Sequence, residues 1–437
     1  MFTFFIIISL FLKIFSYNNT SLQLFRQLKL KIKNSAPYRL KFSSGGIISL
    51  SFPKLYNSNS LGSKNESDNS FILLNNKGEY FDSPLKYYNF SSVMGYTLDK
   101  NDIYYILEQG KIFDNSTVEK NTTKLIIYSA NNGKITDINF EGINLNNNIL
   151  TDIAVDHQGK YAYIIDSGNL NDGDSIPGII VLNLEDKKKI YKILNNHNSF
   201  KDFDAPEPKT FNNIFDIIGI NNIQISCNDE TIYYSSSKKN ISYSISTSDI
   251  LKAIKKFENS KDDNNLNSIT VNSVVTNFKI ENFILSSKGN IFMINSDTKN
   301  IEVSFNINDD LSSINFELNS IINSNDSIKI NKPCSLDIYD GKLYLLVNDK
   351  NGKNLPNIYY AELKKDELNS NIGCTVFFFK ADIFVIILFA LFLIILVISI
   401  ILIIEKSGSK LEKSNLIQQK EKEEAINELN RELNEED

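Results

Sequence analysis

Between residues 20 and 363 the chain alternates short apolar runs with polar turns. The runs are rich in β-branched and aromatic side chains and are bounded by Asn, Asp, Gly or Ser. This pattern is typical of β-strands joined by tight turns, and few stretches have the 3.6-residue period of an amphipathic helix. The sequence therefore predicts an all-β domain over residues 17–370.

One strand–turn–strand unit recurs in this domain. Its clearest copies are residues 153–164, 223–234, 283–293 and 335–345, with weaker copies around 96–105 and 40–50. The centres of the second runs are Ile48, Tyr104, Ala162, Tyr233, Phe292 and Tyr344, at intervals of about 50 to 70 residues. Six such units predict a six-bladed β-propeller, whose four-stranded blades protect their edges by radial packing. A β-sandwich or two small β domains remain as alternatives, because they also show regular turn spacing.

Two of the intervals between units contain long polar segments. These are Asp202–Pro208 and Lys256–Asn267. Because polar insertions between strands run over the surface, we predict that both project from the propeller as loops.

A long apolar run lies near the carboxyl end. Residues 383–404 are apolar except for Ser399, and at about 1.5 Å per residue they cover roughly 33 Å, a full bilayer core. We predict a transmembrane helix here, after a juxtamembrane stalk at 371–382 and before a charged cytoplasmic tail at 405–437. A buried core helix is the alternative, and it would need protein on every side.

The first residues are typical of a secretory signal. An apolar run from Phe4 to Leu12 is too short to span a membrane, and the small residue Ser16 suits a cleavage site. Residues 1–16 are therefore predicted to be a signal peptide. An uncleaved anchor is the alternative, since no Lys or Arg precedes the run. The expected protein is a single-pass type I membrane protein of the plasma membrane or endolysosomal system.

Glycosylation acceptors of the form Asn-x-Ser/Thr support this orientation, because all of them precede the predicted span. They are Asn18, Asn19, Asn65, Asn89, Asn115, Asn121, Asn240 and Asn325. Lysines flank the span on both sides, so counting positive charges does not decide the orientation.

Charge and cysteine content narrow the choice of partners. The net charge is −6 and the basic residues are scattered, so no nucleic-acid partner is expected. An oxidising compartment would permit one disulfide among Cys227, Cys334 and Cys374, most simply Cys227 with Cys334, although spacing alone does not fix a pairing.

Several segments together resemble the major royal jelly protein and yellow family. The likeness lies in residues 151–156, 161–168, 177–184 and 193–199, with further matches at 51–53, 233–234 and 244–247. The resemblance implies a six-bladed, mostly secreted propeller; some relatives bind small amines, and some insect members are linked to dopachrome conversion. This chain departs from the family at Cys334, where relatives often carry Asp, at Ser246, in lacking Trp, and in its added span and tail.

Residues at the start of each innermost strand converge on one mouth of a propeller channel, where small ligands usually bind. By the repeat alignment these are Ser92, Asp152, Asn222, Asn282 and Cys334. Such a ring could hold Ca²⁺, as in the distantly similar lactonase-type propellers, but Asp152 is its one assured carboxylate, so we predict no metal or cofactor. Asp and Asn at strand starts also commonly cap turns.

Two further residues are candidate ligand contacts. Asp166 could face the channel, although the run Asp166–Gly168 is ordinary turn chemistry. His197 could act as a base, but a structural hydrogen bond is its commoner use, since no local motif places a nucleophile beside it. No triad, phosphate loop or zinc spacing occurs, so no catalytic residue is predicted.

The predicted tail contains a candidate sorting signal. Glu412, Leu416 and Ile417 match the acidic dileucine pattern that clathrin adaptors read, and Ile426, Leu429 and Leu433 favour a short helix. A solvated helix face is the alternative.

Three functions follow as hypotheses. The first is a non-enzymatic propeller that binds a small molecule or protein ligand at the channel mouth. The second is a lactonase-like or dopachrome-converting enzyme that uses Asp152, and the third is an endolysosomal sorting or cargo protein.

Overall fold

The structure is a computed structural model. It describes residues 22–28, 36–53, 70–88, 90–110, 123–143, 145, 148–168, 175–200, 219–304, 319–322, 332–348, 356–363, 392, 394–399 and 415–427. The chain divides into two units, Met1–Cys374 and Thr375–Asp437.

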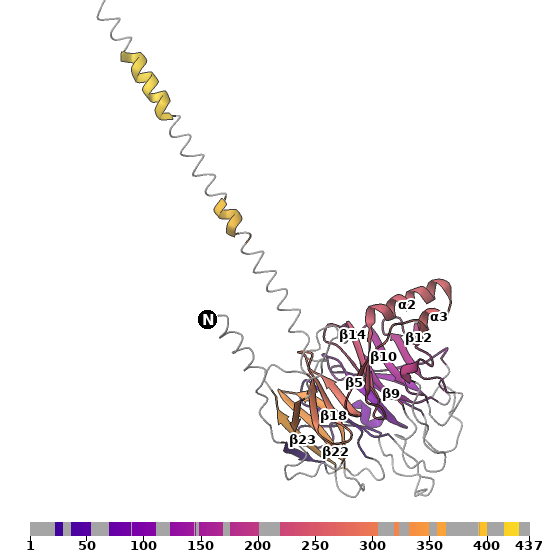
Figure 1. Ribbon diagram of the computed structural model, residues 1–437. Helices are drawn as coiled ribbons and strands as arrows, with labels where there is room; N and C mark the ends of the chain where they lie inside the picture. Colours follow the sequence, from indigo (N-terminus) through magenta and orange to yellow (C-terminus); the bar gives the residue numbers. More distant parts are fainter. Residues whose placement is uncertain are drawn as a thin grey trace, which may run out of the picture. The chain divides into compact units, whose positions relative to one another are not determined.

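Within its described residues, the first unit contains six antiparallel sheets (Figure 1). Blade 1 consists of β2 (Arg39–Phe42), β3 (Ile48–Ser51) and β4 (Phe71–Leu74). Blade 2 consists of β5 (Val93–Leu98), β6 (Ile103–Glu108), β7 (Lys124–Ser129) and β8 (Ile135–Asn139). Blade 3 consists of β9 (Leu150–Val155), β10 (Tyr161–Asp166), β11 (Gly178–Asn183) and β12 (Ile190–Ile193).

The remaining three sheets follow in chain order. Blade 4 consists of β13 (Asn222–Ile225), β14 (Thr231–Ser235), β15 (Ile241–Ser246) and β16 (Asn272–Val275). Blade 5 consists of β17 (Ile280–Leu285), β18 (Ile291–Asn295), β19 (Ile301–Ser304) and β20 (Asn319–Ile322). Blade 6 consists of β21 (Lys332–Tyr339), β22 (Lys342–Asn348), β23 (Asn357–Glu362) and β1 (Gln23–Gln27).

The first strands of the blades form a closed ring. They contact one another in the order β2, β5, β9, β13, β17, β21, and β21 contacts β2. These strands therefore surround a central axis, and the predicted six-bladed propeller is confirmed. The six repeat centres fall on the second strands, β3, β6, β10, β14, β18 and β22, as the repeat predicts.

The ring is closed by the two ends of the propeller sequence. β1 pairs antiparallel with β23, with Gln23 opposite Tyr360 and Gln27 opposite Asn357. Blade 6 thus takes three strands from the carboxyl side and its outermost strand from the amino side. This pairing holds the first and last segments of the propeller together, and the repeat pattern alone did not predict it.

Both faces of the inner strands are buried because each blade packs between two neighbours. In blade 3, Ile153 and Ile164 pack with Leu107 of blade 2. Residues Ala154 and Tyr163, one position along each strand, pack instead with the apolar core of blade 4. Alternate side chains point to opposite faces of a sheet, so the continuous apolar runs serve two interfaces at once.

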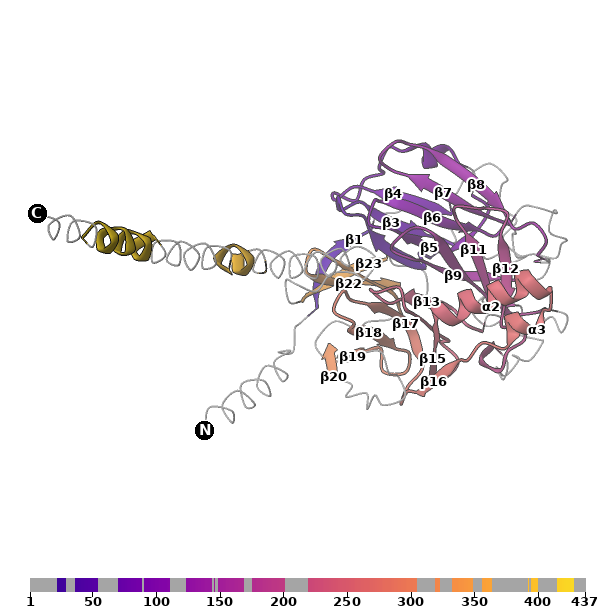
Figure 2. The same ribbon diagram turned by 90° about the horizontal axis from the view of Figure 1, so that it is seen from above.

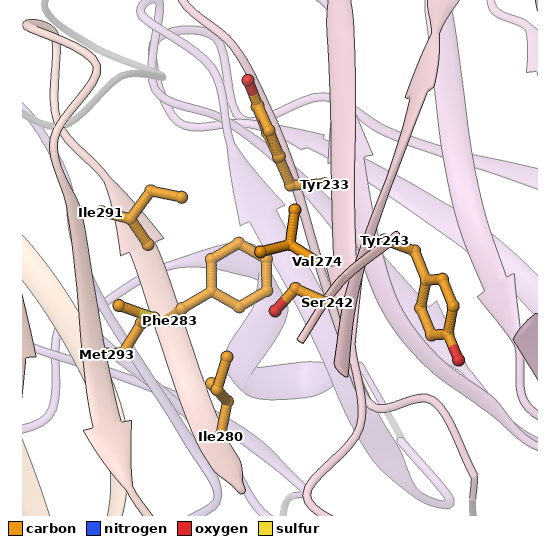
Figure 3. Close-up of a pocket in the computed structure, with 8 residues that line it drawn as sticks. All are labelled: Tyr233, Ser242, Tyr243, Val274, Ile280, Phe283, Ile291 and Met293. Carbon is orange, nitrogen blue, oxygen red and sulfur yellow. The ribbon is translucent and has the colours of Figure 1, made fainter. Parts of the chain in front are cut away.

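The contact between blades 4 and 5 leaves little free space. Figure 3 shows the contact between blades 4 and 5, where Tyr233 and Val274 of one blade and Phe283 and Met293 of the other line a pocket. Its volume of about 20 Å³ is close to that of one water molecule and far below that of a ligand site. This pocket is a packing feature.

Gly95 permits a close approach of two inner strands. A Cβ atom at this position would lie 2.6 Å from Asp152 Cα and 2.7 Å from the carbonyl oxygen of Thr151. Both atoms belong to the backbone of β9, so a neighbouring side chain cannot move aside to make room. Glycine is therefore needed where β5 meets β9.

Helices interrupt the all-β pattern in blade 4. Between β15 and β16 the chain forms α2 (Thr247–Ser260) and α3 (Asn264–Asn267). The α2 helix is amphipathic and buries Ile250, Ala253 and Ile254. The prediction of a projecting loop at Lys256–Asn267 was therefore wrong, because an apolar stripe docks this insertion on the propeller. Figure 2 shows α2 and α3 beside β12, and two short 3₁₀ helices lie at Pro84–Tyr87 and Asn198–Phe200.

The cysteines do not pair as expected. Cys334 carries a free, buried thiol, whereas Cys227 is disulfide-bonded. The predicted Cys227–Cys334 bond is therefore wrong. The third cysteine, Cys374, lies outside the described residues.

The second unit is described only over short helical stretches. Residues 394–399 and 415–427 are helical, and Ile395 and Ile398 are 63% and 51% exposed. Among the described residues, no helix is both long and apolar enough to cross a membrane. Most of the predicted span at 383–404 lies outside those residues.

Several other predictions also fall outside the described residues. They are the signal peptide at 1–16, the stalk at 371–382, Asp202–Pro208, Glu412 and every glycosylation acceptor except Asn240. Asn240 itself is exposed, in the turn between β14 and β15.

Candidate functional site

Arg39 of β2 crosses the axis of the propeller. In the ring of six inner strands β13 stands opposite β2, and Arg39 Nη1 donates to Asn222 Oδ1 of β13 at 3.0 Å. Arg39 Nη2 donates to Asp152 Oδ2 of β9 at 3.2 Å and also to the carbonyl oxygen of Asn221. One guanidinium therefore joins three blades.

The hydrogen bonds continue around the ring. Asn282 Nδ2 of β17 donates to Asn222 Oδ1 at 2.6 Å, and Asn282 Oδ1 accepts from the amide of Leu336 in β21 at 2.9 Å. Asp152 Oδ2 also accepts from the amide of Ile223 at 3.2 Å. We call Arg39, Asp152, Asn222 and Asn282 the axial cluster. The structure thus brings together three of the five residues that the repeat alignment placed at the channel mouth.

The side chains of the axial cluster are buried. Arg39 and Asp152 are 3% and 4% exposed. Burial raises the pKa of Asp152, against the opposing effects of Arg39 and Lys41. Burial alone would lower the pKa of Arg39, but the combined effects of Asp152, Tyr38, Cys334 and Glu281 outweigh it and the pKa is raised. The side chain of Tyr38 covers the guanidinium, whose central carbon lies 4.5 Å from the ring centroid, and burial raises the pKa of Tyr38 to about 12.

The guanidinium takes the position that a cation would take between these oxygens. Asp152 and Asn222 are the kinds of group that bind Ca²⁺, but both already accept hydrogen bonds from Arg39. A divalent ion at this point would be repelled by the guanidinium. In the part of the chain that the structure describes, no group of three or more His, Cys, Asp and Glu side chains could hold a metal ion.

Ser92 and Cys334 lie at inner-strand starts, but their described hydrogen bonds go elsewhere. The amide of Ser92 donates to Glu108 Oε1 at 3.1 Å, and Glu108 also accepts from the amides of Ser91 and Gly110. The thiol of Cys334 donates to the carbonyl oxygen of Leu346 at 3.4 Å. Glu108 was not among the residues predicted from the sequence; the pattern that could have indicated it is a lone carboxylate at the end of an otherwise uncharged strand.

Asp166 belongs to a different place on blade 3. It is fully buried and accepts from Lys192 Nζ at 2.7 Å and Asn148 Nδ2 at 2.7 Å. Its Oδ1 accepts from the amide of Gly168, as expected of a turn residue. Burial raises the pKa of Asp166, and the charge of Lys192 opposes that effect.

Lys192 lines a cavity of about 530 Å³ between blade 3 and the helical insertion. Its polar lining includes Asn148, Ser175, Tyr191, Asn195, Asn196 and Asp263, and its apolar lining includes Ile143, Ile176, Ile190, Phe257 and Leu266. We call this cavity the blade-3 pocket. Its volume lies within the range of small-molecule sites, which is about 300 to 1,000 Å³.

The insertion is held firmly against blade 3. Tyr191 donates its hydroxyl hydrogen to Glu258 at 2.6 Å, and Lys189 forms an ion pair with the same carboxylate at 3.1 Å. The amide of Leu194 donates to the carbonyl oxygen of Leu266 at 3.2 Å. These contacts attach the α2–α3 wall of the blade-3 pocket to blade 3.

His197 has a structural environment. Its Nδ1 accepts from the amide of Ser199 at 3.1 Å and lies 3.0 Å from Ser199 Oγ. The hydroxyl of Tyr234 donates to the same Ser199 oxygen at 2.9 Å. These contacts fix the short helix at Asn198–Phe200, and His197 is not among the residues that line the blade-3 pocket.

Comparison with known proteins identifies no family for this chain. No family profile and no curated protein sequence matches the chain. A gluconolactonase from Xanthomonas campestris has a TM-score of 0.45 and 10% identity, with 78% of this chain and 89% of that chain covered. A luciferin-regenerating enzyme has a TM-score of 0.43 and 12% identity, with 80% and 97% covered.

A third solved structure is of the same kind. Virginiamycin B lyase from Staphylococcus aureus, in a catalytically inactive form, has a TM-score of 0.42 and 12% identity, with 79% of this chain and 100% of that chain covered. All three TM-scores lie below 0.5, so these likenesses say nothing about activity. The family resemblance to royal jelly and yellow proteins is not confirmed.

Proposed function

We propose that this protein is a membrane-anchored, lumenal or extracellular propeller that binds a small-molecule ligand without chemical turnover. The observation that carries the proposal is the occupied axis: the oxygens that would serve a metal or a substrate there are hydrogen-bonded to Arg39. The blade-3 pocket, by contrast, has the volume of a ligand site and a mixed polar and apolar lining. We therefore place the ligand in the blade-3 pocket, beside Lys192, whose ammonium group is paired with the buried Asp166.

The anchoring part of the proposal rests on the sequence. The run at 383–404 has the length and composition of a membrane span. The disulfide-bonded state of Cys227 fits an oxidising compartment, and the exposed acceptor Asn240 is open to glycosylation.

Mass spectrometry of small molecules that co-purify with the full-length protein tests the proposal. We expect a molecule that is lost from an Asp263→Asn, Phe257→Leu double variant and is retained by an Asp152→Asn variant that still folds. Retention by the double variant, with loss from Asp152→Asn, would move the ligand to the axis. A fully folded protein that retains nothing would refute ligand binding.

The competing function is a lactonase-type enzyme at the axis, favoured by the juxtaposition of Asp152, Asn222 and Asn282. It requires a cation to displace Arg39. Calcium should then raise the melting temperature of the wild-type protein, and chelation should abolish lactone hydrolysis. If calcium instead leaves the melting temperature of the wild-type protein unchanged and raises that of an Arg39→Met variant, the guanidinium occupies the position of the cation. The binding proposal then stands.

A further inference from the structure

We propose that the blade-3 pocket binds a neutral, polyhydroxylated ligand, a sugar of one or two rings. The inference deepens the proposed function and rests on it. The charge balance of the pocket, the hydrogen-bonding capacity of its residues and the apolar wall of the helical insertion support it.

The charge balance disfavours an anion. Among the described residues, Lys192 is the basic residue that lines the pocket, and its ammonium group is paired with Asp166 at 2.7 Å. Asp166 is fully buried, so little of its charge is shared with solvent. Together the two residues present a neutral pair to the ligand, and the exposed carboxylate of Asp263 adds negative charge at the rim.

The residues that line the pocket can both donate hydrogen bonds to a ligand and accept hydrogen bonds from it. Lys192 Nζ uses two of its three hydrogens, on Asp166 and on the carbonyl oxygen of Ile176 at 2.5 Å, which leaves one to donate. The exposed amide of Asn196 can donate and accept, and Asp263 can accept. A hydroxyl group both donates and accepts without carrying charge, so several hydroxyls on one ligand match this set.

The apolar wall suits the carbon face of a sugar ring. Phe257 and Leu266 come from the insertion, and Ile190 comes from β12. The Phe257 ring is half-buried and is held edge-on to Tyr191, with centroids 6.2 Å apart. A flat apolar surface beside mixed donors and acceptors is the combination that a ring with axial C–H groups and equatorial hydroxyls requires.

Saturation-transfer NMR and calorimetry on the full-length protein test the inference. A polyoxyethylene detergent is needed, because sugar-based detergents would compete. The probes are lactose and N,N′-diacetylchitobiose as neutral sugars, 2-phenylethylamine as a cation and benzoate as an anion. A glycopeptide with a terminal galactose distinguishes a free sugar from the end of a larger glycan.

We expect a neutral sugar to bind, and Asp263→Asn to weaken it about tenfold, as the loss of one charged hydrogen bond implies. Phe257→Leu should weaken it a few-fold. Asp262→Asn is the matched control, since this neighbouring exposed carboxylate caps the amide of Asn264 and does not line the pocket. The control should bind as wild type does.

The outcomes separate the two proposals. Binding of the amine or benzoate but of no sugar would overturn the sugar inference and leave ligand binding intact. Equal weakening by Asp262→Asn and Asp263→Asn would overturn the placement in this pocket. If no probe binds and no molecule co-purifies with folded protein, both proposals fail.

Discussion

Arg39 and Asn222 lie on opposite blades and meet across the axis of the propeller, with Nη1 and Oδ1 3.0 Å apart. The contact fixes the distance between blades that are not neighbours in the ring. Asp152 and Asn282 extend it to the blades on either side of Asn222. A buried ion pair and its hydrogen bonds therefore cross the axis, and three of the five residues predicted at the channel mouth, Asp152, Asn222 and Asn282, take part in them.

Removing the carboxylate of Asp152 should destabilise the protein strongly. Asp152→Asn leaves a buried guanidinium without its counter-charge, and the expected loss is about 3 to 5 kcal/mol in the free energy of unfolding. Denaturant unfolding measures it. The control is Asp249→Asn, which removes an exposed carboxylate paired with Lys252 and should change the same quantity by less than about 0.5 kcal/mol. If both variants lost an equally small free energy of unfolding, the contacts of the axial cluster would not stabilise the fold.

Adding one methyl group at Gly95 should also destabilise the protein. The new Cβ would meet the backbone of β9 at 2.6 Å, so β5 and β9 must separate, at a cost of about 1 to 3 kcal/mol or more. Gly45→Ala is the matched control, because its nearest neighbour is a side-chain oxygen 3.8 Å away. A Gly95→Ala melting temperature equal to that of the control would contradict the close approach.

The pH dependence of stability should contain a contribution from Glu108. Burial raises its pKa above the ordinary 4.5, although the amides of Gly110, Ser92 and Ser91 oppose the shift. The folded protein then binds the proton more tightly than the unfolded chain does. This contribution to stability is full below about pH 4.5 and is lost as the pH rises through the raised pKa.

The Glu108→Gln variant tests this contribution. It has no titrating group at the position, so its free energy of unfolding should lack that part of the decline with pH. It should also be less stable at all pH values, because an amide cannot accept from all three backbone donors. If the free energies of unfolding of the wild-type and Glu108→Gln proteins changed in parallel from pH 4 to 7, the contribution would not come from Glu108.

The candidate sorting signal makes a separate prediction. Leu416 and Ile417 lie on the helix at 415–427, and each is 59% exposed, so an adaptor could reach them. Replacing both with Ala should shift the protein from endolysosomal compartments to the plasma membrane, as seen by surface biotinylation. Ile426→Ala, on the same helix and equally exposed, should leave the distribution unchanged. An unchanged distribution in the double variant would exclude this signal.

The sequence predicted those features that depend on neighbouring residues. The strand–turn–strand unit placed Tyr104, Ala162 and Tyr344 on second strands, because the alternation of side chains and the turn residues are local properties. The same repeat identified Asp152, Asn222 and Asn282 as residues at inner-strand starts. A regular unit repeated six times was enough to predict the number of blades.

The tertiary structure decided what those residues contact. Arg39 was not a candidate, since nothing near it in the chain indicates that its guanidinium reaches Asn222, 183 positions away. Two other features also depend on contacts between distant segments: the pairing of β1 with β23 and the pocket between Lys192 and Phe257. The sequence likewise did not predict that Cys334 is not disulfide-bonded. Local pattern sets which groups face the axis or a neighbouring blade. Ring closure then decides which polar groups hydrogen-bond to one another and which can still hydrogen-bond to a ligand. The physical reason is that only closure brings distant strands within hydrogen-bonding distance.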